Sequence, residues 1–284
     1  MNNNNVLFQS IEDFVLYVPQ VATGVKFEKI QLNCVNANNK YLFKVIDKDL
    51  FSSEDENIIE FLKHAQANYC AYEMTKTANA TLTKQGSISI DSENMKPNFG
   101  EKQDLLVHYS ETADSYLDLL LAYLKENNID NSKEVSTIFF SSIEDFEEYK
   151  YLANSYRTFI ALKPYINKPE RLFILPKIGD QLDNILTSHT LISLKDAIRG
   201  FVANSAVLSA ISHLKLRYSD AITVSTFISP MQEKFNKEEM KEKKLAIEKD
   251  IKDYSAKLDD ELKRLFAVEN IPFENKTENK GFCF

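Results

Sequence analysis

The sequence predicts a mainly α fold with minor β structure, built as a tandem duplication of a helical-bundle module that carries a short β-hairpin or extended excursion. Three features predict this: an internal repeat, apolar residues spaced every three or four positions, and only a few short apolar runs with strand character. The chain has 284 residues, of which 44% are hydrophobic and 27% charged. That balance is typical of a globular protein with a buried core.

The internal repeat begins with seven residues, six of which are identical. Residues 8–14 read Phe-Gln-Ser-Ile-Glu-Asp-Phe and residues 140–146 read Phe-Ser-Ser-Ile-Glu-Asp-Phe, an offset of 132 positions. The same offset keeps apolar residues in register further along the chain. These pairs are Phe27 and Phe159, Tyr41 and Phe173, Leu42 and Ile174, Phe43 and Leu175, Ile46 and Ile178, and Leu50 and Leu182.

Beyond residue 50 the register of the repeat slips slightly. Ala67-Asn68 then aligns with Ala203-Asn204, and residues 86–90 align with residues 221–225. A polar stretch at residues 127–132 separates the two copies. We therefore predict three parts: a first module over residues 1–130, a second over residues 133–270, and a C-terminal tail over residues 271–284.

Each predicted module opens with a short helix. Ser10 and Ser141 precede the acidic residues Asp13 and Glu144 at the spacing of an N-cap. The apolar runs 41–46 and 172–176 follow, and each predicts a short strand or a buried extended segment, although Pro176 weakens the strand prediction.

A long helix comes next in each module. The first opens at the capping box of residues 53–56, and the second repeats it from Ser193. Apolar residues at helical spacing predict one buried stripe on each helix. These residues are Ile58, Leu62, Ala65, Tyr69 and Tyr72 in the first, and Leu194, Ile198, Phe201, Ser205, Leu208 and Ile211 or Ser212 in the second.

A β-hairpin or extended excursion is expected around Gly86 and around Ala221, before a closing amphipathic helix in each module. The closing helix of the second module is expected over residues 233–263, where Lys and Glu are dense. The apolar seams are Ala113, Tyr116, Leu117, Leu120 and Leu124 in the first, and Ile247, Ile251, Tyr254, Leu258, Leu262 and Leu265 in the second. We expect this second helix to pack on its own module rather than in an intermolecular coiled coil.

Composition argues against several classes of protein. No run of about 18 apolar residues is present, and the Asn-rich start lacks the features of a signal peptide, so we expect a soluble protein of a reducing compartment. Cys34, Cys70 and Cys283 are scattered, which predicts neither a disulfide framework nor a metal site. The net charge of −8 disfavours an electrostatic nucleic-acid binder.

The charge is distributed unevenly. Residues 1–132 hold 11 Lys and no Arg against 19 acidic residues, whereas the remaining residues hold 18 Lys and 5 Arg against 23 acidic residues. In an assembly this asymmetry favours contact between the acidic first half and a basic neighbour. An ordinary solvated face is the more common reason for such an asymmetry.

Motifs for catalysis are missing from the sequence. The six glycines are isolated, so no phosphate-binding loop is expected. None of His64, His108, His189 and His213 belongs to a metal-binding or catalytic motif. The carboxylate pairs Glu12/Asp13 and Glu144/Asp145 fit helix starts better than a catalytic dyad. We expect no catalytic residue, no cofactor-binding residue and no metal ligand.

The C-terminal tail offers the one candidate binding site. A polar tether from Phe273 ends in Gly281-Phe282-Cys283-Phe284. Aromatic side chains are strong anchors where a partner offers a pocket, so we predict that Phe282 and Phe284 bind a partner, with simple fraying of the chain end as the alternative.

Residues 53–90 resemble the head–tail connector (adaptor) proteins of tailed bacteriophages. In them an acidic helix start, here Asp55-Glu56-Asn57, leads through a helix with Ala65 and Tyr69 to a short β excursion at residues 86–88. The duplicated organisation, with Asn94-Met95-Lys96-Pro97 before a helix, also resembles tandem-duplicated proteins of Bacteroidetes phages and prophages.

The resemblance implies a structural protein of the virion, assembled in the cytoplasm of the bacterial host. It implies a homo-oligomeric, twelve-fold ring that contacts the portal protein and a downstream tail or neck protein. DNA would pass through as cargo, and no membrane would be involved. Two alternatives stay open at this point: an enzyme with an unmarked acidic active site, and a non-ring adaptor or cargo protein.

Overall fold

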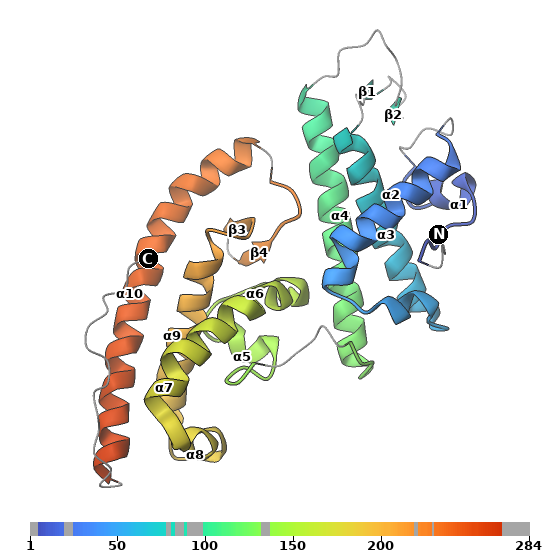
Figure 1. Ribbon diagram of the computed structural model, residues 1–284. Helices are drawn as coiled ribbons and strands as arrows, with labels where there is room; N and C mark the ends of the chain where they lie inside the picture. Colours follow the sequence, from blue (N-terminus) through green and yellow to red (C-terminus); the bar gives the residue numbers. More distant parts are fainter. Residues whose placement is uncertain are drawn as a thin grey trace. The chain divides into compact units, whose positions relative to one another are not determined.

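The protein is mainly α-helical with minor β structure, as the sequence predicts (Figure 1). A computed structural model describes residues 5–19, 25–77, 81–82, 88–89, 99–131, 137–218, 221–228 and 230–268. The chain divides into two compact units. Unit 1 combines residues 1–136, 151–163 and 213–240, and unit 2 combines residues 137–150, 164–212 and 241–284. Unit 1 therefore includes two segments from beyond residue 130.

The first half of the chain contains four α-helices and one strand pair among its described residues. They are α1 (Ile11–Val15), α2 (Phe27–Lys40), the 3₁₀ turns η1 (Leu42–Lys44) and η2 (Lys48–Ser52), α3 (Glu56–Thr77), β1 (Thr81–Leu82), β2 (Ile88–Ser89) and α4 (Phe99–Glu126). Strands β1 and β2 pair antiparallel, with Thr81 opposite Ser89.

The second half runs through a similar order of elements. They are α5 (Ile143–Glu147), α6 (Tyr156–Pro169), the π-helical turn η3 (Glu170–Ile174), α7 (Leu175–Ile178), the 3₁₀ turn η4 (Gly179–Gln181), α8 (Leu182–Thr187), α9 (Ile192–Ala210), β3 (Leu216–Tyr218), β4 (Ile222–Val224) and α10 (Pro230–Val268). In both halves a strand pair separates two long helices along the sequence. Common ancestry of the halves stays a prediction.

The core of unit 1 is a helical bundle in which α3 and α4 lie side by side (Figure 1). The predicted stripe of α3 is buried from Ile58 to Tyr72, and α4 buries Ala113, Leu117, Leu120 and Leu124 against it. In unit 2 the described part of α10 buries Ile247, Ile251, Leu258, Leu262 and Leu265. The spacing of three and four residues predicted these faces correctly.

The extended segments predicted at residues 41–46 and 172–176 are wrong, because both are helical turns. Leu42, Val45 and Ile46 are buried at the spacing of a helix, and the Ile46 amide donates to the Leu42 carbonyl at 3.0 Å. Residues 172–176 run from η3 into α7. Pro176 is tolerated there since the first turn of a helix needs no amide donor from it.

Several predicted helix starts are displaced by one or two residues. The cap of α5 is Ser142 rather than Ser141, and its hydroxyl accepts from the Asp145 amide at 3.4 Å, as Ser10 accepts from Asp13 at 3.2 Å in α1. Helix α3 is capped by Asp55 rather than Ser53, because the Asp55 carboxylate reaches the Asn57 amide at 2.9 Å. Helix α9 begins at Ile192, one residue before Ser193.

Adjacent leucines on α4 test this packing. Leu120 is fully buried, whereas Leu119 is 49% exposed. Leu120→Ala should lower the free energy of unfolding by about 2–5 kcal/mol, because it leaves a cavity between α3 and α4. The matched variant Leu119→Ala should change it by less than about 0.5 kcal/mol. Urea denaturation measures both, and equal effects of the two variants would mean that the buried face of α4 is misassigned.

Candidate functional site

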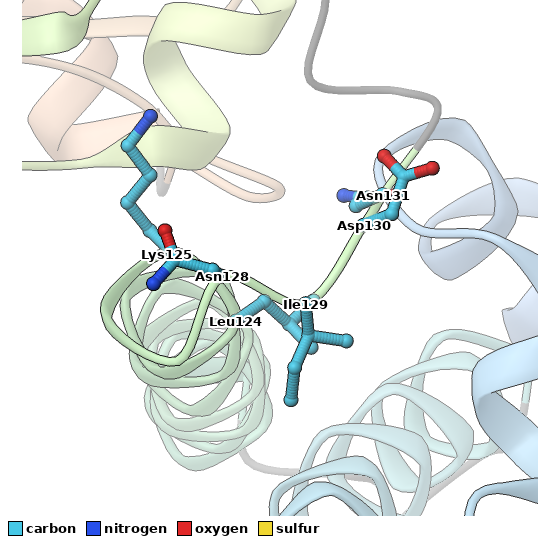
Figure 2. A pocket seen from close by; sticks show the side chains of 6 residues that line it. All are labelled: Leu124, Lys125, Asn128, Ile129, Asp130 and Asn131. Carbon is cyan, nitrogen blue, oxygen red and sulfur yellow. The ribbon is translucent and has the colours of Figure 1, made fainter.

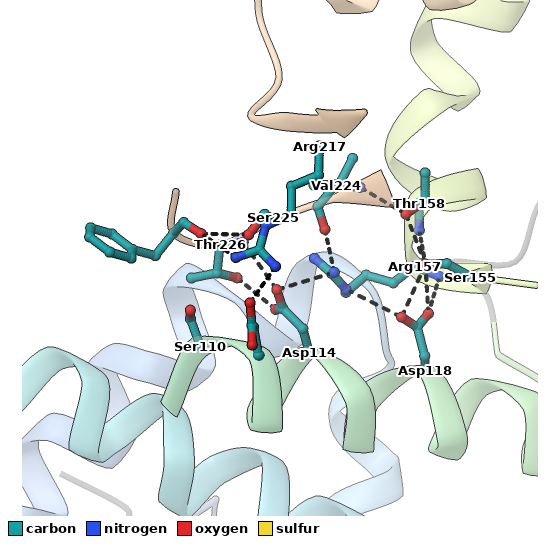
Figure 3. Close-up of polar contacts among 12 residues, drawn as sticks. Ser110, Asp114, Asp118, Ser155, Arg157, Thr158, Arg217, Val224, Ser225 and Thr226 are labelled. Atoms are coloured by element: carbon teal, nitrogen blue, oxygen red, sulfur yellow. Dashed lines mark hydrogen bonds and ion pairs between the residues drawn. The ribbon is translucent and has the colours of Figure 1, made fainter. Parts of the chain in front are cut away.

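The most heavily bonded polar site of unit 1 is a buried ionic cluster on helix α4 (Figure 3). Asp114 and Asp118 lie one turn apart on one face of α4, and Arg157, from the first turn of α6, reaches both. Arg157 Nη2 lies 3.2 Å from Asp114 Oδ2, and its Nε lies 3.8 Å from Asp118 Oδ2. The Arg157 side chain is only 9% exposed, so this pair is largely removed from water.

The turn before α6 places Arg157. Ala153 and Asn154 both adopt positive φ, 56° and 55°, a conformation that costs an alanine roughly 1–2 kcal/mol. Ser155 follows, and its hydroxyl accepts from the Thr158 amide at 3.1 Å as an N-cap. The Arg157 amide donates to Asp118 Oδ1 at 3.0 Å, so Asp118 caps the same helix from outside.

The β3–β4 hairpin closes the cluster on its other side. The Val224 amide donates to Thr158 Oγ1 at 2.9 Å, and the Val224 carbonyl accepts from Arg157 Nη2. Thr226, just after β4, donates its amide and hydroxyl to Asp114, at 3.1 and 2.7 Å. The cluster therefore ties the start of α6 and the hairpin to α4.

Helix α3 also contributes to the cluster. The Tyr69 hydroxyl donates to Asp114 Oδ1 at 2.6 Å. At the rim, Arg217 of β3 pairs with Glu111 of α4, one turn from Asp114, and donates to the Phe227 carbonyl at 3.3 Å. Three segments that are distant in the sequence, α3, the start of α6 and the β3–β4 hairpin, thus meet on one face of α4.

Burial and charge together set the protonation of this cluster. Burial raises the pKa of Asp118, and Arg157 opposes that shift. Burial disfavours the charge on Arg157, but Asp114, Tyr69 and Asp118 outweigh it and raise the pKa of Arg157. Burial, and then the charge of Asp114, raises the pKa of Tyr69 well above its ordinary value. At neutral pH, Arg157 therefore keeps its charge and Tyr69 keeps the proton that it donates.

The cluster acts as a structural clamp. Asp114 accepts from Tyr69, Thr226 and Arg157, and both Asp118 oxygens are occupied by Ser155 and the start of α6. Carboxylates whose oxygens are already bonded are poor proton acceptors for a substrate. The arrangement therefore favours fixing the fold over acid–base chemistry.

Two other buried carboxylates have similar structural roles. Glu73 on α3 accepts from Tyr41 at 2.5 Å and pairs with Lys40; burial opposes its charge, but these partners outweigh burial and lower its pKa. In unit 2, Glu170 accepts from the Ile138 and Phe139 amides at 3.2 and 3.0 Å, and burial raises its pKa. Glu73 therefore fixes the end of α2, and Glu170 fixes the loop before α5.

A hollow of about 240 Å³ lies at the C-terminus of α4 (Figure 2). Asn128 there has φ 54°. The Ile129 amide donates to the Leu124 carbonyl at 2.8 Å, and the Asn128 amide donates to the Lys125 carbonyl at 3.1 Å. This is the Schellman pattern of a helix end, in which an apolar residue after the turn packs on the last turn. The Ile129 and Leu124 side chains meet in this way in Figure 2. The hollow is therefore a feature of the helix cap.

The sequence-predicted site residues Phe282 and Phe284 lie outside the described residues. His64 Nε2 lies 3.3 Å from Glu60 Oε1, and the His64 ring stacks on Tyr116. Cys34 and Cys70 are free and buried. Among the residues that the structure describes, no three His, Cys, Asp or Glu side chains are grouped to hold a metal ion, and no helix is long and apolar enough to span a membrane.

Sequence reasoning missed the Arg157 cluster. Its signal was present in the charge distribution, because all five arginines follow residue 132 while the acidic excess precedes it. Arg157 and Arg217 of the second half pair with acidic residues of the first half, namely Asp114, Asp118 and Glu111.

Comparison with known proteins gives one match. The model of DUF6712, a family of unknown function, matches residues 32–136. That region includes α3, α4 and the acidic residues Glu111, Asp114 and Asp118, and it ends before Arg157. No curated protein and no solved structure matches the chain.

Removing Arg157 tests the clamp. Arg157→Met should lower the free energy of unfolding by about 3–5 kcal/mol, because it leaves Asp114 and Asp118 buried without their counter-charge. Adding Asp114→Asn should cost much less than it does alone, since the two residues are coupled. The control Arg264→Met breaks a surface pair with Glu261, in which Arg264 is 74% exposed, and should cost less than about 1 kcal/mol. Equal losses for Arg157→Met and Arg264→Met in urea denaturation would contradict the clamp.

Proposed function

We propose that the protein is a structural component of a phage head–tail connector (neck) ring that bridges portal and tail and extends the DNA channel. The observation that carries this proposal is that the β3–β4 hairpin binds to helix α4. A hairpin between two long helices, α9 and α10, reaches a helix of the first half and is fixed there by Thr226 and Arg217. Rings need docking elements of this kind, because each subunit must hold its neighbour.

The recurrence of that element supports the proposal. The first half carries the same order of parts, with the β1–β2 pair between α3 and α4. The second pair is docked on α4 of the same chain, and in the proposed ring the first pair docks on a neighbouring subunit. Repeated around a ring, contacts of modest strength give a stable assembly.

Charge also suits this role. A net charge of −8 opposes tight binding to phosphates, so passing DNA is not held by the channel wall. The resemblance of residues 53–90 to connector proteins adds the expectation of a portal partner and twelve-fold symmetry. The anchoring of Phe282 and Phe284 in that partner stays a prediction.

Mass measurement of the full chain mixed with its portal protein tests the proposal, with each protein alone as the control. We expect a complex in which copies of this chain match the twelve-fold symmetry of the portal, seen as a closed ring in negative-stain images. One copy bound to a portal would favour a non-ring adaptor. A chain that stays monomeric and unbound would contradict the connector role.

A further inference from the structure

Two buried thiols meet where helices α2 and α3 pack together. Cys34 of α2 and Cys70 of α3 are 36 positions apart in the sequence, and both side chains are fully buried in the same apolar core. The Cys70 thiol donates to the Ile30 carbonyl of α2 at 3.5 Å. Inside a helix that carbonyl also accepts from the amide four positions on, which is that of Cys34. The Cys70 sulfur therefore lies beside the backbone of Cys34.

The neighbouring turns place the two cysteines opposite each other. Ile30 and Asn38 stand one turn before and one turn after Cys34, so the three lie on one face of α2. Ile30 contacts Cys70 through its carbonyl. Asn38 accepts from the side-chain amide of Gln66, one turn before Cys70, at 2.8 Å. The turns on both sides of Cys34 thus contact α3, so Cys34 faces α3 between them.

The surroundings of Cys70 support this placement. The pKa of the Cys70 thiol is raised well above its ordinary value, first by burial and then by the hydrogen bond and the charge of Cys34. Ala37 and Ala67, three positions from Cys34 and Cys70, are fully buried as well, and such small side chains allow α2 and α3 to approach closely. A disulfide needs a close approach, because its two Cα atoms lie within about 7 Å of each other.

We propose that Cys34 and Cys70 form a reversible disulfide that locks α2 to α3 when the protein is oxidised. Hydrogen peroxide is an oxidant small enough for this site. One sulfur attacks a peroxide oxygen, so the O–O bond breaks, a sulfenic acid forms and one water leaves with the thiol proton. The second sulfur then attacks the sulfenic sulfur, the S–O bond breaks and a second water leaves. Two thiols and one hydrogen peroxide thus give one disulfide and two waters.

Burial decides both the product and the rate. A disulfide is neutral and suits an apolar core, whereas two thiolates on a metal ion would bury charge. Neither thiol is exposed and burial keeps Cys70 protonated, so oxidation requires local opening of α2 and is slow. The thiols therefore stay reduced in a reducing compartment and cross-link after long exposure to an oxidising one. The inference goes beyond the connector role and holds without it.

Thiol counting in the full-length Cys283→Ser variant tests the cross-link, because only Cys34 and Cys70 remain there. The protein is incubated for a long period with hydrogen peroxide, treated with catalase, unfolded in urea and alkylated with N-ethylmaleimide. Intact-mass measurement should show a product that has lost two hydrogen atoms and carries no maleimide. Non-reducing digests should contain one peptide pair joined through the two cysteines, and dithiothreitol before alkylation should restore two maleimide adducts. A protein that keeps both adducts, gains oxygen atoms at the cysteines or links two chains would overturn the proposal.

The stability of the oxidised protein tests the lock itself. A cross-link between positions 34 and 70 restricts the unfolded chain, so oxidation should raise the urea midpoint of unfolding by about 1 M. The matched variant Cys283→Ser/Cys34→Ala keeps one thiol and should show no such rise, and it also reports any effect of methionine oxidation. A cross-linked protein whose midpoint is unchanged or lower would contradict the lock, because α2 and α3 would then have to distort to form the bond.

Discussion

The ion pair between Arg157 and the two carboxylates of α4 is the interaction on which unit 1 depends. A guanidinium and two carboxylates that leave water lose their hydration, and only close pairing with further hydrogen bonds compensates that loss. Here the compensation comes from three segments: α3 through Tyr69, the start of α6 through the Ser155 hydroxyl and the Arg157 amide, and the residue after β4. These bonds tie the start of α6 and the residue after β4 to α4, and they add to the apolar packing of α3 against α4.

This constraint makes unit 1 discontinuous in sequence. The region that matches the DUF6712 family ends at residue 136, yet the counter-charge of its buried carboxylates stands at residue 157. Residues 1–136 alone would leave Asp114 and Asp118 on α4 without the Arg157 cation. The second half therefore completes the first and does more than repeat it.

Local patterns in the sequence predicted the long helices well, whereas contacts between distant residues were not predictable. The stripe from Ile58 to Tyr72 follows from helical spacing alone. The run at residues 172–176 was misread because a short apolar segment with a proline fits a strand and a first helical turn equally. Arg157 and Asp118 are 39 positions apart, and no motif links them. The tail residues Phe282 and Phe284, the only site that the sequence suggested, lie outside the described residues.

Cleavage of the chain between its halves tests the central claim most directly. A specific protease site placed in residues 132–136 of the full-length protein allows the folded chain to be cut, and size-exclusion chromatography then shows whether the two pieces stay together. Our account predicts that they co-elute, since the segments at residues 151–163 and 213–240 belong to unit 1. Pieces that separate under native conditions at physiological salt would contradict it.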